Sequence, residues 1–230
     1  MSEASRPHVG RPVRSLHSPR AWIVLIVVIA AGLGLDIWTK YWAFEHVAGV
    51  PVELDRERLI DNAEYNPIPR HEGQTVLPAG LLDFRLVINH GAVFGIGQEQ
   101  RGFFIAFTVL ATAIGIFAFA AMTSTRQWLA HIGIGLVLAG GIGNLYDRIV
   151  YGVVRDFLHM LPDWHLPFGL TWFGGASQVF PWVFNIADVL LLAGMAMLLI
   201  HVYRVEARQK AEQQAAESSQ SPAAGESTAD

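Results

Sequence analysis

Residues 102–122 read GFFIAFTVLATAIGIFAFAAM, a run of 21 residues without one charged side chain. A helix that crosses the hydrocarbon core of a bilayer needs about 20 mostly apolar residues, so this run predicts a membrane-spanning helix. Three other runs have a similar composition. We therefore predict an all-α membrane protein with four transmembrane helices, at about residues 21–44, 102–122, 127–147 and 181–203.

The first apolar run follows four arginines, which is also how a secretory signal peptide begins. The apolar core of a signal peptide is shorter, and a small-residue cleavage site follows it. Residues 21–35 (AWIVLIVVIAAGLGL) lead into charged sequence without such a site. We therefore expect an uncleaved span.

Basic residues near the ends of the spans predict the orientation, because Lys and Arg accumulate on the cytoplasmic side. They lie before the first span, at Arg126 in the turn between the second and third spans, and at residues 204–210 after the fourth. These places share one side, so we expect both termini in the cytoplasm. The outer loops also contain arginine, so the charge bias is not clean.

The segments outside the spans differ in composition. Residues 1–18 and 206–230 are polar and lack anchoring aromatics, and we expect two disordered cytoplasmic tails around a four-helix transmembrane domain at 19–205. In residues 81–89 (LLDFRLVIN) apolar and polar side chains partly alternate, which predicts a strand of a small extracytoplasmic β-sheet. The loop before the fourth span is rich in Trp, Phe, Pro and Gly. This composition predicts either an interfacial loop or helix that anchors to the membrane or a flap that covers substrate.

Asp188 is the most informative polar residue, because an ionisable group inside a span must face the bundle or a wet cavity. We expect it about eight residues into the fourth span, one turn after Asn185. Asp36 and Lys40 have the i, i+4 spacing of an intrahelical ion pair. A structural aspartate that bonds to a neighbouring helix is the alternative for Asp188.

A second polar cluster closes the third span, where the glycine-rich run 140–143 allows close helix packing. Asn144, Asp147 and Arg148 follow at helical spacing. Asp156 comes nine residues after Asp147 and would by itself be taken for a solvated loop residue. These groups and Asp188 meet at the outer end of the bundle, which predicts a site there.

The residue types limit the chemistry of this site. The chain has no cysteine, no H-E-x-x-H pair and no G-x-S-x-G elbow, so we predict no metal and no cofactor. No basic cluster lies beside stacking aromatics, so we expect no nucleic-acid binding. Two aspartates can hydrolyse a peptide bond when one takes a proton from water and the other donates to the carbonyl oxygen.

Five ordered blocks resemble those of the lipoprotein signal peptidases (signal peptidase II). They are DIWTK (36–40), NHGAVFG (89–95), GGIGNLYDR (140–148), VVRDF (153–157) and FNIAD (184–188). The resemblance implies an aspartyl peptidase of the bacterial inner membrane, with its active site towards the outer face. This enzyme removes the signal peptides of diacylglyceryl prolipoproteins before the lipidated cysteine. Besides this substrate and membrane lipid, we expect no obligate protein partner.

Carried over by motif, the resemblance implies that the catalytic residues are Asp156 and Asp188. The residues that would support the site or contact substrate are Asn89, Asn144, Asp147, Arg148, Asn185, Asp36, Lys40 and Gly141. The chain departs from the family pattern in Arg155, in its long tails and in an insertion, GLTWFGGASQVF (169–180).

Three other functions compete with the peptidase. An ion-coupled transporter also uses intramembrane aspartates, but four spans without a repeat are few for a carrier. A non-catalytic assembly protein uses polar residues to join helices. A presenilin-like protease would need a GxGD block, whereas Asn-Ile-Ala precedes Asp188 here.

Overall fold

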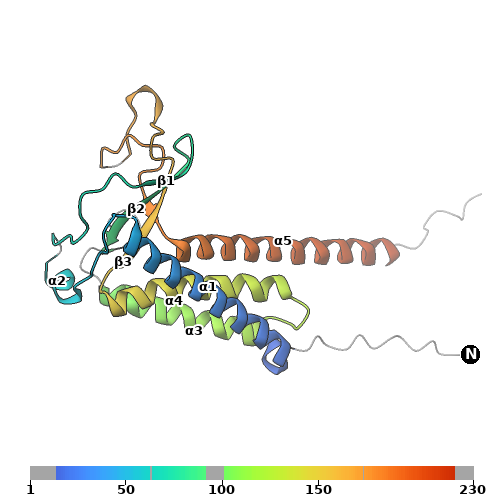
Figure 1. The fold of residues 1–230 in the computed structure, drawn as a ribbon. Helices are drawn as coiled ribbons and strands as arrows, with labels where there is room; N and C mark the ends of the chain where they lie inside the picture. Colours follow the sequence, from blue (N-terminus) through green and yellow to red (C-terminus); the bar gives the residue numbers. More distant parts are fainter. Residues whose placement is uncertain (1–13, 63, 92–100, 173, 221–230) are drawn as a thin grey trace, which may run out of the picture.

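A computed structural model describes residues 14–62, 64–91, 101–172 and 174–220, with the backbone alone for 216–220. Within these residues four helices are long and apolar enough to cross a membrane. They run alongside one another (Figure 1) and are α1 (Pro19–His46), α3 (Arg101–Met122), α4 (Trp128–Val150) and α5 (Ile186–Gln220). The prediction of four transmembrane helices is confirmed.

A small antiparallel sheet lies at one end of the bundle, which we call the sheet end; the opposite end is the tail end (Figure 1). The strand order is β1-β2-β3-β4, with the bounds β1 (Gln74–Leu77), β2 (Leu82–Asn89), β3 (Val154–Met160) and β4 (Val183–Phe184). The predicted strand at 81–89 is β2. The described residues also contain three short helical segments: η1 (Ser15–His17), α2 (Arg56–Asp61) and η3 (Pro167–Gly169).

Helix α4 packs against α1, α3 and α5 and is the central helix of the bundle. Glycines allow this close packing. A Cβ atom on Gly194 of α5 would lie 2.7 Å from the carbonyl oxygen of Gly133 in α4. Small residues therefore bring α4 and α5 together along the membrane, which fixes the start of α5 against the end of α4.

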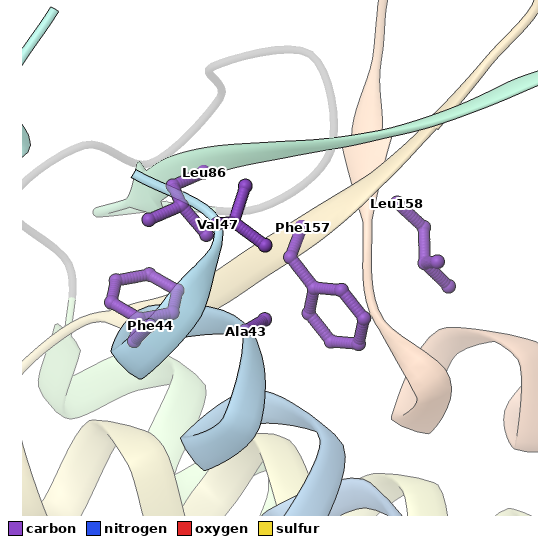
Figure 2. Packing of buried hydrophobic residues seen from close by; sticks show 6 residues of the cluster. All are labelled: Ala43, Phe44, Val47, Leu86, Phe157 and Leu158. Carbon is purple, nitrogen blue, oxygen red and sulfur yellow. The ribbon is translucent and has the colours of Figure 1, made fainter. Parts of the chain in front are cut away.

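An apolar cluster joins the sheet to the bundle. Ala43, Phe44 and Val47 at the end of α1 pack against residues of β2 and β3 (Figure 2). The strand residues of this cluster are Leu86, Phe157 and Leu158. Phe157 follows Asp156 directly, so this packing anchors the strand that carries a predicted catalytic residue.

The fourth span begins five residues later than predicted. Val183 and Phe184 pair with His159 and Leu158 of β3, so this stretch is extended and α5 starts at Ile186. Asp188 is therefore in the first turn of α5 and not eight residues inside a span. The short strand β4 holds the chain extended until Asn185, where the helix can begin.

Both predicted tails are partly ordered. Ser15 is buried and its Oγ lies 2.9 Å from Nε2 of His131, so residues 14–18 pack on the bundle instead of being disordered. Helix α5 continues to Gln220 because residues 206–220 are rich in Ala, Glu, Gln, Lys and Arg, all strong helix formers. The remainder of each tail, residues 1–13 and 221–230, lies outside the described residues.

Candidate active site

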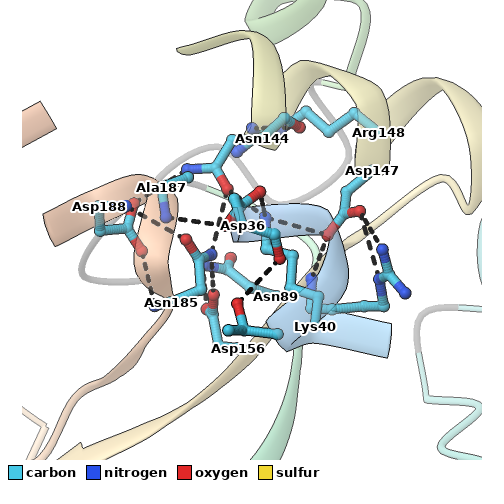
Figure 3. Close-up of polar contacts among 12 residues, drawn as sticks. Asp36, Lys40, Asn89, Asn144, Asp147, Arg148, Asp156, Asn185, Ala187 and Asp188 are labelled. Atoms are coloured by element: carbon cyan, nitrogen blue, oxygen red, sulfur yellow. Dashed lines mark hydrogen bonds and ion pairs between the residues drawn. The ribbon is translucent and has the colours of Figure 1, made fainter. Parts of the chain in front are cut away.

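Polar side chains from five elements meet at the sheet end of the bundle (Figure 3). They come from α1, the end of β2, the end of α4, β3 and the start of α5. Of the ten predicted site residues the structure brings together nine: Asp36, Lys40, Asn89, Asn144, Asp147, Arg148, Asp156, Asn185 and Asp188. Gly141 does not join them.

One half of the cluster is a buried ion-pair network. Nζ of Lys40 lies 2.8 Å from Oδ2 of Asp36 and 3.3 Å from Oδ2 of Asp147, and all three side chains are 0% exposed. The predicted intrahelical pair is therefore present. Lys40 also donates to Oδ1 of Asn144 at 3.0 Å. The backbone N–H of Ala187 donates to Asp36 at 2.8 Å, which ties α1 to the start of α5.

Both carboxylate oxygens of Asp147 are bonded within this network. Nε and Nη2 of Arg155 donate to its Oδ1 at 3.2 and 2.8 Å, and the backbone N–H of Arg155 donates to its Oδ2 at 3.0 Å. The guanidinium lies 4.3 Å from the ring centroid of Tyr151. Arg155 is thus the second cation on Asp147, a role that its sequence position alone did not indicate.

Asp156 forms the other half of the cluster with Asp188. It lies in β3, opposite Val87 of β2, and is only 2% exposed. Its oxygens accept from the side-chain amides of Asn185 and Asn89, at 2.6 and 3.0 Å. Its sequence context alone suggested a solvated loop, but pairing with β2 draws this residue into a strand and buries it.

Asp188 and Asn185 cap α5 reciprocally. The Asn185 side chain accepts from the N–H of Asp188 at 3.2 Å, and the Asp188 carboxylate accepts from the N–H of Asn185 at 3.1 Å. This is the arrangement of a capping box, with Asn at the N-cap and an acidic residue at N3. Oδ1 of Asp188 also accepts from Nδ2 of Asn144 at 2.9 Å.

Two asparagines connect the two halves. Asn185 donates one amide proton to Asp156 and the other to Oδ1 of Asn144, at 2.6 and 3.1 Å. Asn144 accepts from both Lys40 and Asn185 and donates to Asp188. The neutral amides of Asn144 and Asn185 therefore lie between the buried cations and the carboxylates of Asp156 and Asp188. Asn185 contacts both of these carboxylates.

The surroundings of Asp156 favour its protonated form. Burial, together with the nearby charge of Asp188, raises the pKa of this carboxyl to about 7, against the lowering effect of the amides of Asn89 and Asn185. Asp147, by contrast, lies between Lys40 and Arg155. The charge of Asp147 is therefore balanced within the ion-pair network, whereas Asp156 has the charge of a second carboxylate, Asp188, nearby.

Arg148 lies at the rim of the cluster. Nη1 and Nη2 donate to the carbonyl oxygens of Asn144 and Gly91, at 3.3 and 3.2 Å. The guanidinium also lies 5.2 Å from the ring centroid of Phe104. Among the described residues no carboxylate is within ion-pair distance of Arg148, so its partners there are two carbonyl oxygens and an aromatic ring.

The glycines of α4 provide a matched test of the packing behind this site. A Cβ on Gly140 would meet the carbonyl oxygen of Ala187, whereas one on Gly141 would have only a methyl of Thr108 near it, at 3.8 Å. Gly140→Ala should lower the free energy of unfolding by about 1–3 kcal/mol through overpacking. Gly141→Ala should be neutral or slightly stabilising, since Ala favours a helix. Unfolding in lipid micelles measures both, and equal losses would contradict this packing.

Residues 28–204 match the family model described as Signal peptidase (SPase) II. The chain belongs to the signal peptidase II family. It is 32% identical over 184 residues to the lipoprotein signal peptidase of Geobacillus thermodenitrificans, covering 79% of this chain and 90% of the relative. The corresponding protein of Dichelobacter nodosus is 31% identical over 170 residues, covering 72% and 84%.

A solved structure of a bacterial membrane enzyme, obtained by the in meso method at 2.3 Å resolution, shares the fold. Its TM-score is 0.55 at 21% identity, covering 86% of this chain and 93% of that one. Membership of the signal peptidase II family supports a bacterial multi-pass membrane protease that cleaves the signal peptides of lipoproteins. It gives no support to the transporter or to the assembly protein.

Proposed function

We propose that this signal peptidase II is an aspartyl endopeptidase and that Asp156 and Asp188 are its catalytic pair. The observation that carries the proposal is their shared partner. Asn185 donates to Asp156 at 2.6 Å through its side chain and to Asp188 at 3.1 Å through its backbone. Asp36 and Asp147, the other two carboxylates of the cluster, are neutralised by buried cations.

The pair would hydrolyse the peptide bond without a covalent intermediate. Asp188, the more exposed of the two, takes a proton from water as the oxygen attacks the scissile carbonyl carbon. Asp156 donates its proton to the carbonyl oxygen, which gives a tetrahedral diol. Collapse of the diol with protonation of the amide nitrogen breaks the C–N bond and returns one shared proton to the pair.

The pH dependence of cleavage should reflect the proton on Asp156. The pKa of this carboxyl is raised to about 7 in the folded protein. The proton is therefore bound below that value and lost above it, so kcat should fall as the pH rises through about 7. The same proton favours folding: its contribution is complete below the ordinary aspartate pKa and disappears as the pH rises through the raised value.

Rate measurements across this range, with infrared detection of the carboxylic acid carbonyl, test the assignment. The protonated band should be absent in Asp156→Asn. In Asp188→Asn the pKa of Asp156 should drop, because the repelling charge is gone. A rate that is flat through neutrality, or a band that survives in Asp156→Asn, would contradict it.

The location of the pair suits a substrate anchored by lipid. The four spans end beside it, so the acyl chains of a diacylglyceryl prolipoprotein would stay in the leaflet while the bond before the modified cysteine reaches the aspartates. Arg148 would donate its forked N–H groups to ester or backbone carbonyls of this substrate. With both termini in the cytoplasm, the sheet end would face outward from the inner membrane.

Cleavage by the purified protein tests this function. A diacylglyceryl precursor and the same precursor without lipid are incubated with the protein in micelles, and the products are separated by mass. We expect cleavage before the modified cysteine in the lipidated precursor alone. Cleavage of both at equal rates would refute the substrate class, and cleavage of neither would refute the peptidase.

A further inference from the structure

The chain between β3 and β4, residues 161–172 and 174–182, forms a projecting arm that we call the aromatic arm. Figure 1 shows it standing away from the sheet, to the side of the bundle and not along the direction of the helices. It contains most of the insertion that distinguishes this chain from the family pattern. Because it projects sideways, its tip would lie over the lipid around the bundle.

Hydrogen bonds across the aromatic arm give it a defined shape. The N–H groups of Leu166 and Val179 donate to the carbonyl oxygens of Ser177 and Trp164, both at 2.7 Å. At its base, Nε1 of Trp164 donates to the carbonyl oxygen of Ala79 at 3.1 Å. The exposed side chains on the arm are therefore presented by an ordered scaffold.

These side chains are apolar. Phe168 is 99% exposed and has a φ of 60°, a left-handed conformation that is costly for a bulky residue. Leu170, Trp164 and Trp172 are also exposed. From residue 164 to residue 187 the sequence has no Asp, Glu, Lys or Arg, and His165 is its one ionisable side chain. A strained turn that holds the phenyl ring of Phe168 in water gains nothing from packing within this chain, as is typical of a surface that binds an apolar partner.

The helices show where the membrane surface lies at this end. Exposed Trp38 and Tyr41 of α1 mark one boundary, and exposed Trp128 of α4 marks the other. On α4 the distance from Trp128 to Tyr146 is about 27 Å at the helical rise, close to the thickness of a hydrocarbon core. The bond from Ala187 to Asp36 places the start of α5 level with Trp38, so the arm leaves the protein at this boundary.

We propose that the aromatic arm inserts Phe168 and Leu170 into the boundary between headgroups and acyl chains, and that its partner is the lipid surface beside the bundle. Uncharged sequence rich in aromatics, directed sideways at the level of the aromatic boundary, fits lipid better than a protein surface. The inference requires the four spans but not the catalytic assignment, so it can fail while the proposed function stands.

Depth measurement with a single fluorescent probe tests this inference. The chain has no cysteine, so Phe168→Cys supplies a unique thiol for an environment-sensitive NBD group. The full-length protein is placed in phosphatidylcholine and phosphatidylglycerol vesicles with and without lipids that carry a nitroxide near the headgroup. We expect emission at shorter wavelength than in water and loss of intensity with the nitroxide lipids. Leu170→Cys should give the same result.

Two matched probes calibrate the signal. Ile114→Cys, exposed in the middle of α3, reports the bilayer interior, and Glu212→Cys reports water, since it lies about 13 Å beyond Tyr203 on α5. Water-like emission at positions 168 and 170, with no more quenching than at Glu212, would overturn the inference. So would shifted emission that nitroxide lipids do not quench, because protein would then cover the arm. A circular dichroism spectrum with the helical signal of the unlabelled protein confirms that each labelled variant is folded.

Discussion

Replacing Asp156 by asparagine should reduce the kcat for prolipoprotein cleavage by a factor of about 10²–10⁴, the usual contribution of general acid–base catalysis. Asparagine has nearly the same shape and can still accept from Asn185, so its carbonyl oxygen preserves one of the two hydrogen bonds. It cannot hold the shared proton. Time courses with a lipidated precursor measure the rate, and thermal unfolding measures whether the fold persists.

Asp147→Asn is the matched control, because Asp147 precedes Asp156 by nine residues and is equally buried. Its loss leaves Lys40 and Arg155 without their shared carboxylate. We therefore expect reduced stability from Asp147→Asn, and reduced catalysis without unfolding from Asp156→Asn and Asp188→Asn. If Asp156→Asn cleaves at nearly the normal rate, Asp156 is not catalytic.

Lys40→Met should destabilise the protein by about 3–5 kcal/mol, the usual effect of removing one partner from a buried ion pair. Methionine fills similar space without charge. The decrease in the free energy of unfolding therefore measures the cost of burying Asp36 and Asp147 without the Lys40 cation. Asp36 and Asp147 would then be buried beside each other with one cation, Arg155, in place of two. Equilibrium unfolding in mixed micelles measures the change.

An exposed ion pair on the same molecule is the control. Arg58 lies 3.2 Å from Asp55, with side chains that are 69% and 45% exposed. Arg58→Gln should cost less than about 1 kcal/mol, because water screens such pairs. In a double-mutant cycle, adding Asp36→Asn to Lys40→Met should recover part of the loss. Additive losses would show that Lys40 and Asp36 do not stabilise each other.

The parts of this molecule that could be predicted from sequence are those that depend on local patterns. Uninterrupted apolar runs predicted the four spans because a bilayer accepts few alternatives. The Asp36–Lys40 pair followed from helical spacing. The capping box could also have been recognised, since Asn185 and Asp188 have the N-cap and N3 spacing. That signal would have placed the start of the fourth helix correctly.

The different surroundings of Asp147 and Asp156 could not be predicted from local pattern. They depend on long-range contacts: β3 must pair with β2 before Asp156 faces Asn89, and α1 must pack on α4 before Lys40 reaches Asp147. Arg155 was likewise identified only as unusual, because its carboxylate partner lies across a turn. In the sequence, only the resemblance of the five blocks to the family pointed to a catalytic role for Asp156.

The reciprocal cap of α5 has a consequence for heat inactivation. Helix ends ordinarily fray before the rest of a protein unfolds. Here the hydrogen bonds that start the helix also orient Asp188, and the Asn185 side chain that closes the cap also holds Asp156. Opening this single turn would move the carboxylates of Asp156 and Asp188 apart while the bundle stays folded. Amide hydrogen exchange at Asp188 should therefore follow the loss of activity on warming, ahead of global melting.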